Sequence, residues 1–204
     1  MGVDRQLSES LAQWRNARVV ILGVGNTLKG DDAVGPLVCE RLSGRVSARV
    51  IDAGITPENY IRPILEAAPD VLLIVDAINC GACPGEMCIV PLDQVDRSVF
   101  STHALSLHLS IDLIRRERAL EACLVGIQAG NVRLGDCLSP AVEDAVERLV
   151  GMLTECFPSA QPQCGLCSPP IPFGEPLLEW SQTDQTEAEE EEGSGFGNRG
   201  GLDR

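Results

Sequence analysis

The chain has 204 residues, 44% of them hydrophobic, which is enough for one α/β domain with a buried core and an appendage. Its net charge of -14 weighs against a nucleic-acid-binding protein, because phosphate recognition requires clustered Lys and Arg side chains. No apolar stretch reaches the roughly 18 residues of a membrane helix, and the N-terminus lacks the apolar run of a secretory signal. We therefore expect a cytoplasmic, monomeric protein that binds neither nucleic acid nor a membrane.

The first third of the chain predicts two strand–helix units. Residues 18–25 (RVVILGVG) form a short apolar run that ends in glycines, which indicates a buried strand followed by a sharp turn. Asp31 and Asp32 open a helix in which apolar residues recur at helical spacing. Residues 47–52 predict the second strand, and an amphipathic helix follows through Ala68.

Three further strands are predicted. The five apolar residues at 71–75 (VLLIV), followed by Asp76, indicate a fully buried central strand with a polar C-terminal tip. Residues 87–92 (MCIVPL) predict an edge strand, because Pro91 cannot donate a hydrogen bond to a neighbouring strand. Residues 122–128 (ACLVGIQ) predict the last strand.

Two long helices complete the predicted pattern. One covers 103–116 and is capped by Ser101 or Thr102. Its apolar face is predicted to include Leu105, Leu109 and either Asp112 or Leu113. The other helix starts at Ser139-Pro140. Its predicted sheet-facing residues are Val142, Ala145, Val146, Leu149, Val150 and Leu153.

Strands that alternate with helices predict a mostly parallel twisted sheet that is covered by helices on both faces. We expect an N-terminal extension at 1–17, an α/β domain at 18–157 and a tail at 158–204. The tail is rich in Pro and then acidic, with nine acidic and two basic residues from Phe157 onward. Such a segment cannot bury enough apolar area to offset its ordering entropy, so we expect it to be largely disordered.

Carboxylates follow the first three predicted strands. Ligands of open α/β sheets bind beside the C-terminal ends of strands, where Asp32, Asp52 and Asp76 are expected. Asp32 and Asp76 would converge if their strands are neighbours. His103 begins a helix after an irregular segment, from which its side chain could reach over the edge of the sheet. Two carboxylates and one imidazole suit a divalent ion such as nickel or zinc, and they leave coordination positions open for substrate.

Each of these residues also has a purely structural interpretation. An Asp at the start of a helix is usually a cap, and a lone His near a helix start usually has no function. Asp76 is harder to explain in this way, because a carboxylate directly after a buried strand is costly unless it is paired or liganded.

Six short strings of this sequence resemble, in order and spacing, those of the nickel-iron hydrogenase maturation proteases. They are GVGNTLKGDDAVGP (23–36), IDAGITPEN (51–59), LLIVDA (72–77), PGE (84–86), THAL (102–105) and GIQ (126–128). The resemblance covers residues 18–155. The GDD and PEN forms are more similar to the branch that serves formate-hydrogenlyase-type hydrogenases.

The resemblance implies a three-layer α/β/α fold and an endopeptidase, a hydrolase that removes the C-terminal extension of a hydrogenase large-subunit precursor after nickel insertion. It implies that Asp32, Asp76 and His103 bind the metal and form the catalytic site. Gly54 and Ile55 would face the substrate, where glycine lets a peptide backbone approach closely. The sequence departs from the family at Ala129, where Pro is frequent, at its cysteines 80 and 83, and in its acidic tail.

Two mechanisms fit these residues. In the first, the metal polarises the scissile carbonyl and lowers the pKa of a bound water, while Asp31 or Asp76 accepts a proton. In the second, the nickel is supplied by the substrate and the three ligands recognise it. We favour the second mechanism, because it explains how the protease can work without a stored metal.

Two alternatives come from other classes of protein. Gly23 and Gly25 after a strand are typical of a dinucleotide-binding oxidoreductase, but carboxylates at the start of the following helix would repel a pyrophosphate. A zinc-linked interaction module could use Cys80 and Cys83 with Cys164 and Cys167. The two pairs are separated by 80 residues, far more than the roughly 15 to 20 of known zinc sites.

The remaining polar residues have simpler interpretations. We expect Cys39, Cys88 and Cys123 to be buried as small hydrophobic residues. His108 lies five residues after His103, which places it on another face of the helix, so that it cannot easily bind the same ion. The run Glu189–Glu192 is expected to be part of the solvated tail.

Overall fold

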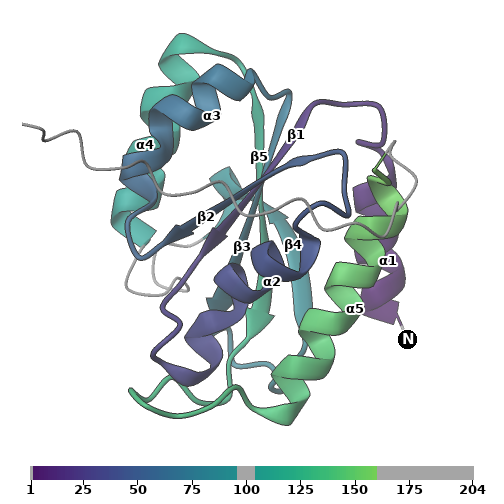
Figure 1. Cartoon of the computed structure of the whole chain (residues 1–204), viewed down its shortest axis with the longest axis vertical. Helices are drawn as coiled ribbons and strands as arrows, with labels where there is room; N and C mark the ends of the chain where they lie inside the picture. The colour runs from purple at the N-terminus through teal and green to yellow at the C-terminus, as the bar shows by residue number, and fades with distance from the viewer. Residues whose placement is uncertain (1, 96–103, 160–204) are drawn as a thin grey trace, which may run out of the picture. The chain divides into compact units, whose positions relative to one another are not determined.

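The computed structural model describes residues 2–95 and 104–159, which form a five-stranded sheet with helices on both faces (Figure 1). The strands are β1 (Val19–Val24), β2 (Arg49–Gly54), β3 (Val71–Ile78), β4 (Met87–Pro91) and β5 (Glu121–Gln128). Their order in the sheet is β2-β1-β3-β5-β4. All neighbours are parallel except β4, which runs antiparallel to β5 at one edge. The predicted mostly parallel sheet, with an edge strand at 87–92, is therefore confirmed.

Five α-helices and three short 3-10 helices connect these strands. The α-helices are α1 (Gly2–Ala12), α2 (Val34–Leu42), α3 (Ile61–Ala67), α4 (Ala104–Glu117) and α5 (Pro140–Cys156). The 3-10 helices are η1 (Gly30–Ala33), η2 (Pro57–Tyr60) and η3 (Leu92–Gln94). Among the described residues, no helix is both long and apolar enough to span a bilayer.

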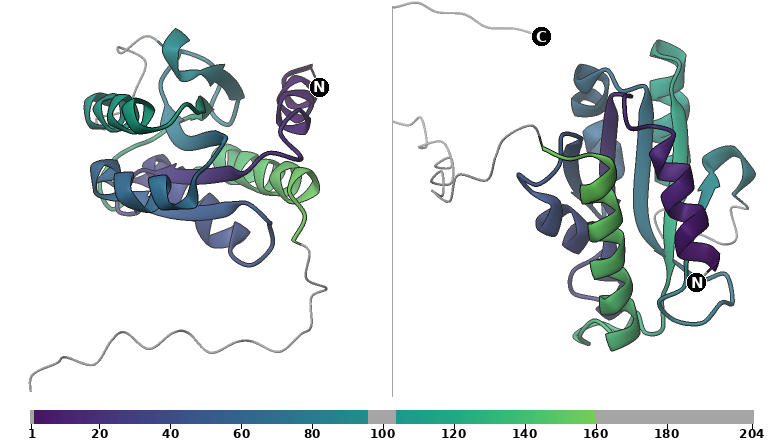
Figure 2. Two further views of the ribbon diagram at one scale, coloured as in Figure 1. Left: turned by 90° about the horizontal axis from the view of Figure 1, so that it is seen from above. Right: turned by 90° about the vertical axis from the view of Figure 1, so that its right-hand side faces the viewer.

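The hydrophobic core has two halves, one on each face of the sheet. Successive strand residues point to opposite faces, and β3 is buried along its whole length, as a central parallel strand should be. One half packs the sheet against α1, α2 and α5, and the other packs it against α3 and α4 (Figure 1, Figure 2). These two halves confirm the three-layer α/β/α sandwich.

The segment expected as an N-terminal extension packs onto this same core. α1 buries Leu7 and Leu11, and Trp14 follows them into the interior. The indole Nε1 of Trp14 donates a hydrogen bond of 3.0 Å to Glu121 Oε2 at the start of β5. The predicted tail at 158–204, including Glu189–Glu192, lies outside the described residues from position 160 onward.

The predicted end of the third strand was wrong. The strand was expected to stop at Val75, with Asp76 as its polar tip, but β3 continues to Ile78. Its pairing with β5 continues through Asp76↔Gly126 and Ile78↔Gln128, so the ladder extends past the carboxylate. Asp76 consequently lies inside the strand and is fully buried.

The predicted apolar face of the helix at 103–116 was wrong at Leu109 and Leu113, whereas the side chain of Leu105 lies outside the described residues. Leu107, Ile111 and Ile114 are buried against the sheet, whereas Leu109 and Leu113 are exposed. α4 carries apolar residues on more than one face, and the side that packs is the one with i, i+4, i+7 spacing from Leu107. In α5, by contrast, all six predicted residues are buried.

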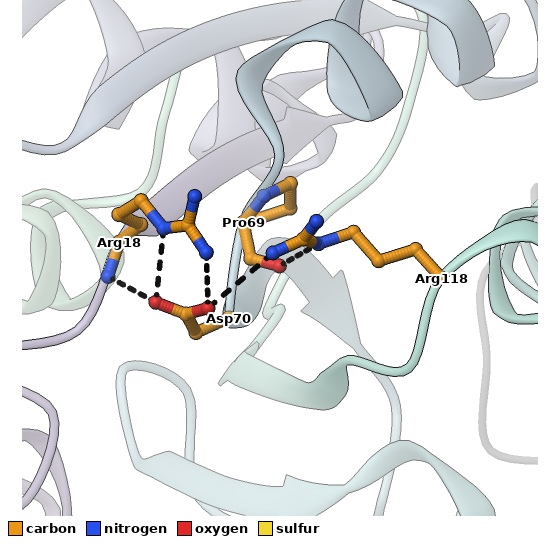
Figure 3. A network of polar contacts seen from close by, with 4 residues as sticks. All are labelled: Arg18, Pro69, Asp70 and Arg118. Carbon is orange, nitrogen blue, oxygen red and sulfur yellow. Dashed lines mark hydrogen bonds and ion pairs between the residues drawn. The ribbon is translucent and has the colours of Figure 1, made fainter.

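A charged network closes the end of the sheet opposite the strand tips (Figure 3). Arg18 Nη2 lies 2.8 Å from Asp70 Oδ1, and the Arg18 backbone N–H donates to Asp70 Oδ2 at 3.0 Å. Arg118 Nε donates to the Pro69 carbonyl at 2.9 Å, and its Nη2 lies 3.5 Å from Asp70 Oδ1. The hydrogen bonds from Arg18 hold the pKa of Asp70 well below its usual range.

We expect Asp70→Asn to lower the free energy of unfolding at neutral pH by a small amount, because the network is exposed to solvent. A carboxyl whose pKa is lowered by folding stabilises the protein above its unfolded pKa of about 3.9, and this contribution is lost as the pH falls towards the folded value. Urea unfolding should therefore show a gap between wild type and variant that narrows below about pH 4. A gap that does not change with pH would contradict this. Asp112→Asn, on the exposed side of α4, is the control.

Candidate functional site

The candidate site lies at the C-terminal ends of β1 and β3. These two strands are neighbours in the sheet, which is the condition under which Asp32 and Asp76 were expected to converge. The last paired residues of β1 and β3 are Gly23 and Val75, and Asp76 comes next in β3. Asp32 belongs to η1, which follows the loop after β1 and lies against β3. Both carboxylates are thus positioned at the same end of two adjacent strands.

Two glycines let the helix layer approach the strands at this point. A Cβ added at Gly35 in α2 would lie 2.2 Å from the carbonyl oxygen of Val24 and 2.6 Å from that of Val75. A Cβ at Gly23 in β1 would lie 2.3 Å from the carbonyl oxygen of Gly35. The start of α2 therefore contacts the strand backbones directly, which brings the preceding η1 close to the strand ends.

The turn after β1 fixes the backbone of Asp32. Gly25 has a φ of +142°, and a Cβ there would lie 2.0 Å from the Asp32 carbonyl oxygen. Asn26 N donates to that oxygen at 3.0 Å, and Asp32 N donates to the Lys29 carbonyl at 3.0 Å. These contacts hold the backbone of Asp32 from both sides, after the C-terminal end of β1.

Asp31 is a structural residue, and it is unsuited to the proton-accepting role that the first mechanism gave it as one candidate. Its side chain is fully buried. Oδ2 accepts hydrogen bonds from Gly130 N (2.7 Å), Asn131 N (2.8 Å) and Ser139 Oγ (2.9 Å), and Oδ1 accepts one from Ser139 N (2.6 Å). The carboxylate ties the segment between β5 and α5 to η1, and both of its oxygens already accept hydrogen bonds.

Asp32 differs from its neighbour in this respect. Its side chain is only 5% exposed, yet no group among residues 2–95 and 104–159 forms a hydrogen bond or ion pair with its carboxylate. Burial without a partner is unfavourable for a carboxylate. The oxygens of Asp32 are therefore available to an external cation or hydrogen-bond donor.

Asp76 lies on the face of β3 that α4 covers, because it alternates with Val75 and Ala77 of the opposite face. α4 begins at Ala104, the residue after His103, and it contacts η2, which follows the C-terminal end of β2. His103 itself lies outside the described residues, so its role as third ligand stays a prediction. The described residues contain no group of three His, Cys, Asp or Glu side chains that could hold a metal.

The predicted substrate loop is tied to the same turn. Gly54 has a φ of +51°, and its carbonyl accepts a hydrogen bond of 2.9 Å from Gly25 N. A Cβ at Gly54 would meet nothing within 4 Å, and the next residue, Ile55, is exposed. Asp52 Oδ1 accepts a hydrogen bond of 2.9 Å from Gly54 N, so Asp52 stabilises this turn.

One residue of the predicted strings, Gln128, has a structural role that the sequence did not reveal. Its Oε1 accepts hydrogen bonds from Cys80 N (2.9 Å), Cys80 Sγ (3.3 Å) and Ala82 N (3.3 Å), and its Nε2 donates to the Ala129 carbonyl. Gln128 is buried. It anchors the loop after β3 to the end of β5. The position of Gln128, at the end of a buried strand, was the only signal for this role.

The cysteines divide into two groups. Cys39 and Cys123 are buried as expected, and Cys88 is half-buried. Burial raises the pKa of the Cys39 thiol to about 12 and that of Cys123 to about 11, so both stay protonated. Cys80 and Cys83 are exposed, and their proposed zinc partners Cys164 and Cys167 lie outside the described residues. His108 is half-buried beside Asp93.

Comparison with known proteins identifies the family. The family model described as hydrogenase maturation protease (HycI) matches residues 36–156. The Hydrogenase 3 maturation protease of Escherichia coli (strain K12) is 38% identical over 131 residues, which cover 63% of this chain and 83% of that protein.

Solved structures agree with this result. The [NiFe] hydrogenase maturation protease HycI from Thermococcus kodakarensis KOD1 superposes with a TM-score of 0.65 at 34% identity, over 72% of this chain and 97% of that one. The endopeptidase HycI from Escherichia coli gives a TM-score of 0.61 at 33% identity, over 68% and 90%. These matches decide against the dinucleotide-binding alternative, and the two carboxylates in η1 give the physical reason. The chain belongs to the hydrogenase maturation protease family.

Proposed function

We propose that the chain is an endopeptidase that removes the C-terminal extension of a nickel-iron hydrogenase large-subunit precursor, and that it recognises nickel held by that precursor through Asp32, Asp76 and His103. The observation that carries the proposal is the contrast between two adjacent buried carboxylates. The Asp31 carboxylate accepts four hydrogen bonds, whereas the Asp32 carboxylate accepts none from the described part of the chain.

The available donor set suits the proposed ion. Carboxylate oxygens and an imidazole nitrogen are ligands for borderline divalent metals, and three protein ligands leave positions for groups of the substrate. Asp32 and Asp76 come from adjacent strand ends, and α4 begins directly after His103. The turn at Gly54 supports the same proposal, because a peptide backbone could approach it without meeting a side chain.

The roles of the protein groups follow from their environments. Asp31 cannot accept a proton without losing hydrogen bonds that hold the segment before α5. Asp32 and Asp76 remain as candidates to orient the scissile peptide and to accept a proton from the attacking water. The positive charge of nickel in the substrate would attract these two carboxylates and so place them beside the scissile bond. Cleavage would then be licensed only when the precursor has received its metal.

The first test compares nickel-loaded with metal-free precursor. We expect the purified enzyme to cut the loaded precursor and to spare the metal-free form, with gel analysis of the processed large subunit as the measurement. Equal cleavage of both forms would reject nickel recognition. That outcome would still be consistent with the proposed peptidase activity.

The second part of the test replaces the three proposed ligands. Asp32→Ala, Asp76→Ala and His103→Ala should each lower processing of loaded precursor by at least about 100-fold, as expected for loss of a group at the reaction centre. Asp112→Ala, on the exposed side of α4, is the matched control and should process normally. Circular dichroism should show that every variant is folded. Normal processing by any of the three would remove that residue from the site.

A further inference from the structure

Exposed apolar side chains are concentrated beside the candidate site. Three of the six large hydrophobic residues that are exposed in the described part of the chain lie on two neighbouring loops: Leu28 (65% exposed), Val132 (52%) and Leu134 (72%). Leu28 is in the loop after β1, and the other two are in the loop after β5. Large apolar side chains clustered in this way on a surface are typical of an interaction site.

Hydrogen bonds join the two loops along their length. Gly135 N donates to the Leu28 carbonyl at 2.8 Å, Gly30 N to the Asp136 carbonyl at 3.2 Å, and Asp31 N to the Asn131 carbonyl at 2.7 Å. Both loops lie together at the lower end of the molecule in Figure 1. The three apolar residues therefore belong to one surface, although about 100 residues of sequence separate its two parts.

The loops are also held internally. Asn26 Oδ1 accepts a hydrogen bond of 2.9 Å from Leu28 N, and Asn131 Oδ1 accepts one of 3.1 Å from Arg133 N. The Asn131 side chain donates to Asp136, and the buried carboxylate of Asp31 anchors the start of the second loop. A surface that is already ordered loses little conformational entropy on binding, so its apolar side chains can contribute fully to affinity.

Two cations border these apolar side chains. Lys29 follows Leu28 and is the only lysine in a chain of net charge -14, and Arg133 lies between Val132 and Leu134. Neither side chain forms an ion pair or hydrogen bond with any residue that the structure describes. Unpaired positive charge in an acidic protein favours a partner that presents carboxylates at the same place.

We infer that Leu28, Val132 and Leu134, with Lys29 and Arg133, form a docking surface for the large-subunit precursor, which would present an apolar patch bordered by acidic side chains. This inference rests on the proposed function. The precursor is the expected occupant because the surface is continuous with the site: the Lys29 carbonyl accepts the hydrogen bond from Asp32 N.

The test replaces the apolar side chains and compares KM and kcat of this variant with those of a control variant. For the variant Leu28→Ser/Val132→Ser/Leu134→Ser we expect KM for nickel-loaded precursor to rise by roughly tenfold or more, with kcat changed by less than about twofold. The control is Leu109→Ser/Leu113→Ser, which removes two leucines that are 57% and 48% exposed and that lie on α4 rather than on either loop. The control should leave both constants unchanged.

The charges are tested by salt dependence. Lys29→Gln/Arg133→Gln should lower kcat/KM at low ionic strength and should flatten its dependence on salt, because steering by exposed charges is screened. If the salt dependence equals that of wild type, the cations have no part in docking. If the serine variant keeps the wild-type KM, the docking surface is refuted.

Binding measurements separate this inference from the proposed function. Asp32→Asn should bind immobilised metal-free precursor with wild-type affinity, because that complex has no nickel contact to lose, whereas the serine variant should bind it weakly. Cutting of nickel-loaded precursor by Asp32→Asn would refute the proposed site and leave the docking result valid. Sedimentation of the wild type as a dimer that the serine variant dissociates would show that a second copy of the chain occupies the surface, and the inference would be wrong.

Discussion

Gly35→Ala should strongly destabilise the protein, although it adds only a single methyl group to a helix. The new Cβ would lie 2.2 Å and 2.3 Å from the backbone O and N of Val24 and 2.6 Å from the carbonyl oxygen of Val75. These atoms belong to two strands of the sheet and cannot move aside as a side chain could. We expect a loss of about 3 kcal/mol or more, a large part of the 5 to 15 kcal/mol of a typical domain.

Gly151→Ala is the matched control, because Gly151 also lies in a helix that covers the sheet. A Cβ at Gly151 would meet no heavy atom within 4 Å. Alanine should therefore raise the free energy of unfolding by about 0.5 to 1 kcal/mol through the lower entropy of the unfolded chain. Urea unfolding followed by circular dichroism measures both variants. Stability of Gly35→Ala within about 1 kcal/mol of wild type would contradict the close contact of α2 with the strands.

The sequence predicted the layers of the fold because hydrophobic patterning determines them directly. α5 carries its apolar residues on one face only, so its buried side could be read from spacing alone. α4 carries leucines and isoleucines on several faces, and the packed side depends on which neighbours cover it. The end of β3 was also predicted wrongly because it depends on a distant neighbour. The residues after Asp76 stay in the strand because they pair with β5, some 50 residues later in the chain.

The candidate site was only partly predictable. Strand order places Asp32 and Asp76 at the same end of two adjacent strands, and the pattern of strands and helices was sufficient to expect this. Nothing in the string Gly30-Asp31-Asp32 distinguishes a structural carboxylate from one that is open to a ligand. The difference arises because the segment before α5 folds back onto Asp31. Long-range contacts of this kind also create the apolar surface at Leu28.

The contrast between the hydrogen-bonded Asp31 carboxylate and the Asp32 carboxylate predicts opposite effects of their substitutions on stability and on processing. Asp31→Asn places an amide N–H₂ where the carboxylate accepts hydrogen bonds from Ser139 N or from Gly130 N and Asn131 N, so donors would face donors in a buried site. We expect a loss of about 3 kcal/mol in the free energy of unfolding, given about 1.5 to 3 kcal/mol for each hydrogen bond to a charged group. Amide hydrogen exchange at Gly130 and Asn131 should accelerate.

Asp32→Asn should leave stability within about 1 kcal/mol of wild type or raise it, because no hydrogen bond from the described residues is lost and burying a neutral amide costs less than burying a carboxylate. Processing of the nickel-loaded precursor should nevertheless fall by at least about 100-fold. Urea unfolding, exchange at Gly130 and a processing assay on both variants measure these effects together. If Asp32→Asn were as destabilised as Asp31→Asn, Asp32 would have a structural partner, and its availability to a metal held by the precursor would be refuted.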